Sequence, residues 1–277
     1  MKARTQLREV DEMGSRVLRT FAVLNALLFC LLHMSGQEPK VASPESLNSL
    51  REHAAKGEAA AQFNLGVMYG EGQGVTRDHA EAVRWYRKAA DQGHAAAQFN
   101  LGVMYANGQG VTQDYAEAVR WYRKAADQGI AAAQSNLGVM YDKRQGVTQD
   151  YAEAGRWYRK AADQGHAAAQ SNLGVMYANG QGVTQDYAEA VRWFRQAADQ
   201  GTAAAQYSLG VMYSKGQGVT QDYAEAVRWY RKAADQGDAD AQFNLGVMYD
   251  IGQGVTQDYV LAHMWLNLAA SNSSGEN

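Results

Sequence analysis

The sequence NLGVMYGEGQGVTRDHAEAVRWYRKAADQG, from Asn64 to Gly93, decides the fold because it returns every 36 residues. Its opening string NLGVMY reappears unchanged in four later copies and as SLGVMY in a fifth: Asn100–Tyr105, Asn136–Tyr141, Asn172–Tyr177, Asn244–Tyr249 and Ser208–Tyr213. Self-similarity at one fixed period is typical of solenoids, in which each repeat is a single supersecondary unit.

The first half of each copy predicts a helix, which covers residues 59–69 in the first copy. Ala61, Leu65 and Tyr69 are spaced i, i+4, i+8 and therefore share one helical face. Gly66 lies inside this helix, where glycine costs about 1 kcal/mol relative to alanine. We therefore expect a second helix to cross at Gly66 so closely that no Cβ fits.

The second half of each copy predicts another helix, which begins at Asp78 after the glycine-rich turn Gly70–Gly74. Asp78 and Glu81 match a capping box, in which each side chain satisfies a backbone N–H at the helix start. Gly93 follows the helix at the position where a left-handed residue is common. Three basic residues of this helix are expected to face solvent: Arg84, Arg87 and Lys88.

A single hairpin of this kind cannot bury its apolar face, whereas stacked hairpins can. The sequence therefore predicts an all-α solenoid of six helix-turn-helix repeats, each 36 residues long. The expected repeats are 58–93, 94–129, 130–165, 166–201, 202–237 and 238–273. We expect a capping helix within residues 41–57, with Ser43 as its N-cap, and a polar, disordered tail at 274–277.

The N-terminal segment 1–40 differs in character from the repeats. Thr20–Met34 carries no charge, has about the length of a signal-peptide core, and follows the basic residues Arg16 and Arg19. This pattern predicts a signal peptide or an uncleaved anchor, and hence a periplasmic, secreted or envelope-anchored protein of a bacterium. A cytoplasmic protein is the alternative if the segment is neither cleaved nor inserted. Translation can start at Met1 or at Met13.

Composition and motifs argue against several functional classes. The formal net charge is −3 without a long run of one sign, whereas nucleic-acid binders usually present a basic face. The only cysteine, Cys30, precedes the repeats, so they contain no disulfide and no thiolate metal site. No histidine pair has metal-ligand spacing, and no nucleophile elbow or phosphate-binding loop is present. We therefore predict no enzyme, cofactor or metal.

These residues resemble the Sel-one-like repeat (SLR), a branch of the tetratricopeptide-like helical repeats. The resemblance rests on Leu65-Gly66-x-x-Tyr69, the turn from Gly72 to Asp78, Trp85-Tyr86 and Ala89-Ala90-x-x-Gly93. It implies a right-handed α/α superhelix that acts as an adaptor for other proteins. The third copy departs from the pattern twice, with Arg144 in place of a turn glycine and Gly155 in place of valine.

Similar repeats line their concave surface with the first helix of each pair, and the resemblance places the binding site there. One column of that face is aromatic at both ends of the array and small and polar in the middle. We predict that a protein or peptide binds a groove lined by Phe63, Val67, Phe99, Val103, Ser135, Ser171, Tyr207 and Phe243. The alternative is that the aromatic residues pack against the adjacent repeat.

The recurring tryptophan supports a further alternative, a ligand or glycan binder. The six equivalent positions are Trp85, Trp121, Trp157, Trp193, Trp229 and Trp265. Such a function requires exposed indole rings, whereas packing between repeats buries them. Contact with a membrane is expected only through the N-terminal segment, and only if that segment stays uncleaved.

Overall fold

The structure is a computed structural model that describes residues 44–274, and these residues form thirteen α-helices and no strand. They belong to one compact unit that begins at Pro44. Ser43, the expected N-cap, and the segment 1–40, the expected signal peptide or anchor, lie outside the described residues. None of the described helices combines the length and apolar character that a membrane span needs.

The first helices of the six pairs are each thirteen residues long. They are α4 (Ala59–Glu71), α6 (Ala95–Asn107), α8 (Ala131–Lys143), α10 (Ala167–Asn179), α12 (Ala203–Lys215) and α14 (Ala239–Ile251). Each ends at a residue in the left-handed conformation, such as Gly72 with φ 76° and Gly108 with φ 66°. Glycine suits this position because a Cβ would clash with its own backbone there.

The second helices follow after the turns. They are α5 (His79–Asp91), α7 (Tyr115–Asp127), α9 (Tyr151–Asp163), α11 (Tyr187–Asp199), α13 (Tyr223–Ala234) and α15 (Tyr259–Ser274). At the end of α5, Gly93 has φ 89° as expected. Its N–H donates to the Ala90 carbonyl at 3.0 Å, and His94 N–H donates to Ala89 at 3.1 Å, which together form a Schellman motif.

The capping prediction was half right. The Asp78 carboxylate accepts a hydrogen bond from the Glu81 N–H at 3.0 Å, as expected for an N-cap. The reciprocal bond is replaced, because the Asp78 N–H donates to the Tyr69 carbonyl at 2.8 Å. The Glu81 carboxylate is thereby left to pair with Arg84 at 2.6 Å. A backbone hydrogen bond thus closes the turn between the helices, and Glu81 forms an ion pair on the outer surface.

In the first five repeats, the glycine inside the first helix leaves room for an aromatic ring from the second helix of the same repeat, and in the sixth repeat Gly246 faces Leu266. A Cβ on Gly66 would lie 2.6 Å from Cδ1 of Tyr86, which is closer than real Cβ atoms approach. Gly102 faces Tyr122 and Gly138 faces Tyr158 in the same way. The predicted close approach is therefore confirmed, and the group that fills the space is a buried aromatic ring.

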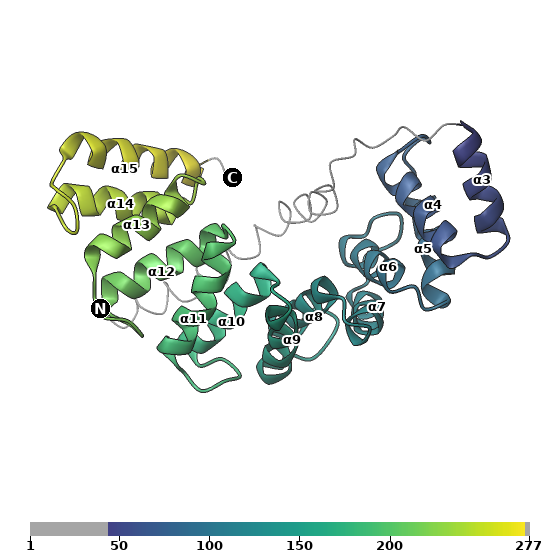
Figure 1. The fold of residues 1–277 in the computed structure, drawn as a ribbon, viewed down its shortest axis with the longest axis horizontal. Helices are drawn as coiled ribbons and strands as arrows, with labels where there is room; N and C mark the ends of the chain where they lie inside the picture. Colours follow the sequence, from purple (N-terminus) through teal and green to yellow (C-terminus); the bar gives the residue numbers. More distant parts are fainter. Residues whose placement is uncertain (1–43, 275–277) are drawn as a thin grey trace. The chain divides into compact units, whose positions relative to one another are not determined.

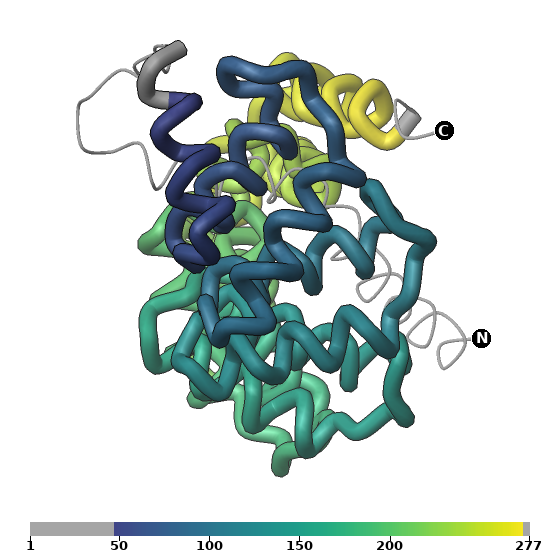
Figure 2. The backbone as a smooth tube through the Cα atoms, turned by 90° about the vertical axis from the view of Figure 1, so that its right-hand side faces the viewer, coloured from purple at the N-terminus to yellow at the C-terminus, as the bar shows by residue number. Residues whose placement is uncertain are grey.

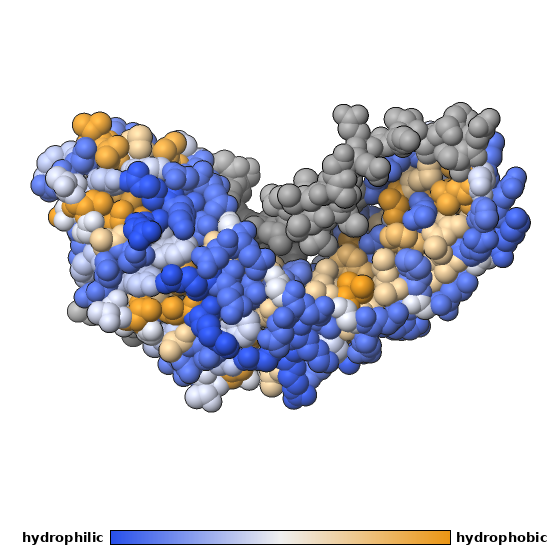
Figure 3. Space-filling view, viewed as in Figure 1, coloured by the Kyte–Doolittle hydropathy of each residue, from blue (hydrophilic) through white to orange (hydrophobic). Residues whose placement is uncertain are grey.

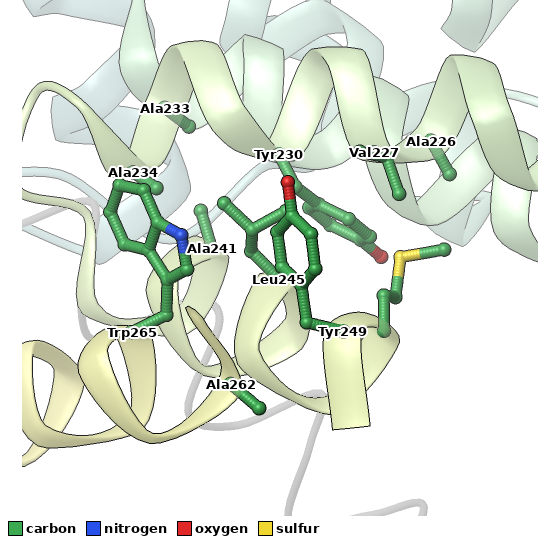
Figure 4. Close-up of a cluster of buried hydrophobic side chains, with 11 residues drawn as sticks. Ala226, Val227, Tyr230, Ala233, Ala234, Ala241, Leu245, Tyr249, Ala262 and Trp265 are labelled. Atoms are coloured by element: carbon green, nitrogen blue, oxygen red, sulfur yellow. The ribbon is translucent and has the colours of Figure 1, made fainter. Parts of the chain in front are cut away.

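Successive repeats share their cores. Helix α5 supplies Val83 and Tyr86 to a cluster that also contains Leu101 and Met104 of α6 and Trp121 of α7. Figure 4 shows the equivalent cluster at the other end, where Tyr230 of α13, Leu245 of α14 and Trp265 of α15 meet. Each helix packs mainly against the helices before and after it in the chain, which is the organisation of a solenoid.

A buried glutamine in each first helix bonds to the preceding repeat. In α6, Gln98 is 4% exposed, and its Nε2 donates to the Ala90 carbonyl at 3.0 Å. The Oε1 of Gln98 accepts from Nε2 of Gln128 at 2.7 Å. The same donation to a carbonyl near the end of the preceding helix recurs in the other first helices, at Gln62, Gln134, Gln170, Gln206 and Gln242.

An arginine expected to face solvent is also engaged between repeats. Arg87 is half-buried, and its guanidinium donates to the Tyr105 hydroxyl of the next repeat. Arg123 and Tyr141 repeat this pairing one step along the array. Only Arg84 and Lys88 are exposed as predicted. Arg87 therefore belongs to the interface between repeats, since its hydrogen bond joins two of them.

The stack of helices curves, and the first helices of the pairs lie on the inner side of the curve (Figure 1). The tube in Figure 2 follows the same order from α3 (Pro44–Ala55) to α15. Helix α3 covers the N-terminal end, where Ala54 packs with Ala61 and Leu65 of α4. Helix α3 falls within the range 41–57 given for a capping helix, and α15 continues past Ala270 to Ser274.

The third repeat keeps the geometry of the others despite its two unusual residues. Arg144 stands at the end of α8 with φ 58°, in the same left-handed region as the glycines of the other copies. Gly155 is buried in α9, which has the same length as α5, α7 and α11. The third hairpin is therefore not shorter or broken, and Arg144 carries the conformational cost of the turn.

Candidate protein-binding groove

The candidate groove is the surface formed by the exposed residues of the first helices, which follow one another along the inner side of the curve (Figure 1). Each first helix buries its alanine, glutamine, leucine and methionine positions against its neighbours, as Ala97, Gln98, Leu101 and Met104 do in α6. The remaining positions of the helix are those predicted to line the groove. Hydrophobic residues show over α4 and α6 in the space-filling view (Figure 3).

The aromatic residues of the groove are partly covered by their own repeats. Phe63, Phe99 and Tyr207 are half-buried. The ring centroid of Phe99 lies 6.0 Å from that of Tyr122, and the two rings are tilted. Phe63 and Tyr207 make the corresponding contacts with Tyr86 and Tyr230, at 5.9 and 5.8 Å. Each ring therefore packs on a tyrosine and keeps one part of its surface accessible.

The two ends of the aromatic column differ. At the N-terminal end, Phe63 also stacks on His94 of the next repeat, with 4.7 Å between ring centroids. At the C-terminal end, Phe243 is 54% exposed. The alternative of packing against the adjacent repeat therefore holds for Phe63 and for Tyr207, whose hydroxyl bonds to Asn244 of the next repeat, while Phe243 offers most of its ring to solvent.

The serines in the middle of the column are buried. Ser135 is 1% exposed and Ser171 is 9% exposed. Their hydroxyl groups are therefore not offered to a partner, contrary to the expectation of a small polar surface. What they change is shape, because a serine replaces the projecting ring of repeats 1, 2, 5 and 6. The valines that complete the predicted lining, Val67 and Val103, are half-buried.

The floor behind these residues is a row of buried tyrosine hydroxyls paired with asparagine side chains. Burial raises the pKa of Tyr86 to about 12, and its hydrogen bond to Asn100 lowers the pKa by a smaller amount. Burial likewise raises the pKa of Tyr230 to about 12, and bonds to Ser214 and Asn244 oppose the shift. These phenols stay protonated at neutral pH, so their hydroxyl groups carry no charge.

One carboxylate sits in the middle of this floor. Asp142 ends the exposed face of α8, and partial burial raises its pKa. The Lys143 ammonium, 3.6 Å away, opposes that shift by stabilising the charged form. The carboxylate in turn raises the pKa of the buried Tyr158 hydroxyl, whose own burial is the larger cause. The centre of the groove thus combines a small side chain at Ser135 with a paired charge.

The tryptophans do not form an exposed ladder. Trp121, Trp157, Trp193, Trp229 and Trp265 are between 1% and 7% exposed, and only Trp85 at the N-terminal end is half-buried. Lysine ammonium groups cover several ring faces, such as Lys124 at 4.2 Å from the centroid of Trp121. A glycan site that needs stacked, exposed indoles is therefore excluded at these five positions.

Comparison with known families identifies the repeat. The Sel1 repeat model matches six consecutive segments: 59–94, 95–130, 131–166, 167–202, 203–238 and 239–274. The chain belongs to the Sel1 repeat family. Sel1 repeat proteins are generally protein-interaction scaffolds, and the all-α solenoid expected from the sequence is the fold of this family.

Solved structures of Sel1 repeat proteins resemble the chain closely. A protective antigen present in uropathogenic Escherichia coli strains, which displays an SLR fold, is 46% identical with a TM-score of 0.78. The match covers 81% of this chain but 48% of that one, so the chain spans about half the length of that relative. A Sel1 repeat protein from Oxalobacter formigenes is 39% identical with a TM-score of 0.73, covering 82% and 93% of the two chains. Comparison with the curated proteins gave no match.

Two structural features escaped the sequence-based prediction. The glutamine bonds between repeats were missed, although Gln98 and its equivalents recur inside an otherwise apolar string, which could have flagged them. The other is the apolar surface of the last pair, where Val260, Met264 and Leu268 are exposed. The sequence could have indicated this surface, because Tyr259–Ala270 lacks the charged residues that the second helices of the earlier copies carry.

Proposed function

We propose that this Sel1 repeat protein is a scaffold that binds another protein, or an extended peptide, on the inner face of its array. A role in binding other proteins follows from membership of the Sel1 repeat family. The inner face as the site is supported by the half-buried rings of Phe63, Phe99 and Tyr207 and the exposed ring of Phe243. Such rings contribute contact area with few rotatable bonds to order on binding.

The single observation that carries the proposal is how these rings are held. Phe99 rests on Tyr122 and Tyr207 rests on Tyr230, so each ring is fixed before a partner arrives. Fixing a contact surface in advance reduces the ordering cost of association. Because the floor beneath is made of protonated phenols, the partner segment is expected to present apolar or aromatic side chains at both ends of the groove.

The proposal is tested by capturing partners with the full chain and with a variant that carries Phe63→Ser, Phe99→Ser, Tyr207→Ser and Phe243→Ser. Serine is compatible with this position, since Ser135 and Ser171 occupy it in repeats 3 and 4. A matched control carries Arg84→Ala, Arg120→Ala, Arg156→Ala and Arg228→Ala on the outer faces. We expect partners that persist with the control and are lost with the groove variant, at unchanged helical circular dichroism. Equal capture by both variants would refute the groove.

We further propose that the protein is exported from a bacterial cytoplasm, either cleaved after the apolar segment or held by it in the envelope. The support is the uncharged Thr20–Met34 stretch behind Arg16 and Arg19, which lies outside the described residues. The 46% identical structure belongs to a protective antigen, which is in keeping with export. N-terminal sequencing of the protein recovered from cell fractions tests this, because an intact N-terminus in the cytoplasmic fraction would contradict it.

A further inference from the structure

The exposed large hydrophobic side chains of the described residues are confined to one helix pair. All six that are exposed belong to the last helix pair: Phe243, Ile251, Tyr259, Val260, Met264 and Leu268. Hydrophobic residues gather over α14 and α15 in the space-filling view (Figure 3). Contiguous exposed apolar surface of this kind usually marks an interaction site.

Three of the six form a continuous stripe along α15. Val260, Met264 and Leu268 are spaced i, i+4, i+8 and therefore lie on one helical face. They are 78%, 41% and 41% exposed. This stripe, called here the α15 stripe, is not the side on which a following repeat would stack. That side carries His263 and Asn267, whose side chains bond to each other at 3.0 Å.

Earlier repeats show what this face normally carries. The positions equivalent to Val260, Met264 and Leu268 are Ala80, Arg84 and Lys88 in α5, and alanine, arginine and lysine again in α7, α9 and α13. In α5, α7 and α9 this arginine pairs with a glutamate three residues earlier, at 2.6, 3.0 and 3.0 Å. In α15 the glutamate and arginine positions hold Leu261 and Met264. A charged, solvated face has thus become apolar only in the last repeat.

We propose that the α15 stripe docks against the same stripe of a second copy of this chain, forming a tail-to-tail dimer. Charge supports this occupant, because α15 contains no aspartate, glutamate, lysine or arginine. Two such helices meet without like-charge repulsion, whereas a charged partner would find no complementary group. An i, i+4, i+8 ridge can also interdigitate with a copy of itself.

The opposite end of the array offers no alternative apolar counterpart. There α3 turns Leu47, Leu50 and Ala54 toward α4. Apart from Ala55 at its end, its exposed described residues are polar: Asn48, Ser49, Arg51, Glu52 and His53. A head-to-tail contact would therefore bury the α15 stripe against charge. Among described surfaces the stripe is its own best match, which gives a closed twofold interface rather than a growing filament.

The experiment compares three full-length chains by sedimentation equilibrium between about 1 and 200 μM, because so small an interface implies weak binding. The test variant carries Val260→Ala, Met264→Arg and Leu268→Lys, which restores the residues of α5, α7, α9 and α13. The control carries Arg120→Ala and Lys124→Ala on α7. We expect the native chain and the control to dimerise with rising concentration, and the test variant to stay monomeric with unchanged helicity and melting temperature.

Two results would overturn the proposal: a native chain that is monomeric throughout, or a test variant that still dimerises, which would place association elsewhere, such as Thr20–Met34. A second measurement locates the contact. In a Cys30→Ser background, Met264→Cys lies at the centre of the stripe and should oxidise to a disulfide-linked dimer. Arg120→Cys, at the equivalent position of α7, should not, and equal cross-linking of the two variants would refute the tail-to-tail arrangement.

Discussion

The side-chain amide of Gln128 donates a hydrogen bond of 2.7 Å from Nε2 to Oε1 of Gln98. Gln98 in turn donates to the Ala90 carbonyl of the preceding repeat, so one buried amide joins three helices. The bond gives a second donor to a carbonyl at the end of α5, which also accepts from the Gly93 N–H at 3.0 Å. The array is therefore held by polar bonds of fixed length as well as by hydrophobic burial.

Replacing this amide should destabilise the array. Gln98→Leu keeps the side-chain size but removes one of the two hydrogen bonds to the Ala90 carbonyl, which retains the Gly93 N–H, and also removes the acceptor of Gln128. We expect the free energy of unfolding to fall by about 1 kcal/mol. Urea unfolding followed by circular dichroism measures the change. Gln109→Leu, in the exposed turn that follows, serves as the control and should alter the free energy of unfolding by less than about 0.5 kcal/mol. Equal effects of the two substitutions would show that the buried bond contributes nothing.

The turn of the third repeat should be improved by glycine. Arg144 has φ 58°, a conformation that is unfavourable for residues with a Cβ by about 1–2 kcal/mol. We expect Arg144→Gly to raise the free energy of unfolding by about 1 kcal/mol. The reciprocal change Gly108→Arg, at the equivalent position of the second repeat, should lower it by a similar amount. A destabilised Arg144→Gly variant would mean that the arginine side chain makes a compensating contact.

Two helical glycines should respond to alanine with opposite signs. A Cβ on Gly155 would meet the flexible Met176 Cε at 3.3 Å, and alanine is favoured over glycine in helices by about 1 kcal/mol. A Cβ on Gly138 would lie 2.6 Å from the buried ring of Tyr158. Gly155→Ala should therefore raise the melting temperature, and Gly138→Ala should lower it. Thermal unfolding of the two variants distinguishes the cases.

Acid should weaken the N-cap of α10. His166 Nδ1 accepts from the Ala169 N–H at 3.3 Å, and burial lowers the pKa of this imidazole below its usual 6.5. His166 therefore binds a proton more readily in the unfolded chain than in the folded one. Its contribution to the free energy of unfolding is complete above pH 6.5 and declines as the pH falls below that value.

The test of this pH dependence uses two variants. In His166→Asp, a carboxylate caps α10 as Asp238 caps α14, where it accepts from the Ala241 N–H at 2.8 Å. This variant should lose less stability than the native chain between pH 7 and pH 5. His166→Ala should be less stable than the native chain by about 1 kcal/mol at pH 7, because it has no cap, and this difference should shrink toward pH 5. Parallel stability curves for the native chain and His166→Asp would contradict the account.

The fold was predictable from the sequence because its determinants are local and repeated. The 36-residue period fixed the number of hairpins, and the glycines fixed their boundaries, as Gly72 and Gly93 illustrate. Gly66 predicted that another helix approaches closely, although the sequence did not identify Tyr86 as the residue in contact. Each of these signals depends on backbone conformation within a few residues, so each can be read without knowing the neighbours.

Properties that depend on contacts between repeats were harder to predict. Ser135 was expected at the surface and is buried, because exposure is set by side chains of the adjacent repeat. Arg87 was expected in solvent and bonds to Tyr105, eighteen residues away. The sequence places such residues on a face, but which neighbour covers that face is decided by how hairpins stack.

Photo-cross-linking from the groove tests the central claim most directly. A p-benzoylphenylalanine at position 99, on the inner face, is compared with one at position 120, on the outer face of α7, in the full chain with its captured partner. The account predicts a covalent adduct with the partner from position 99 and none from position 120. Adducts formed only from position 120 would contradict it, because they would place the binding surface on the outside of the array.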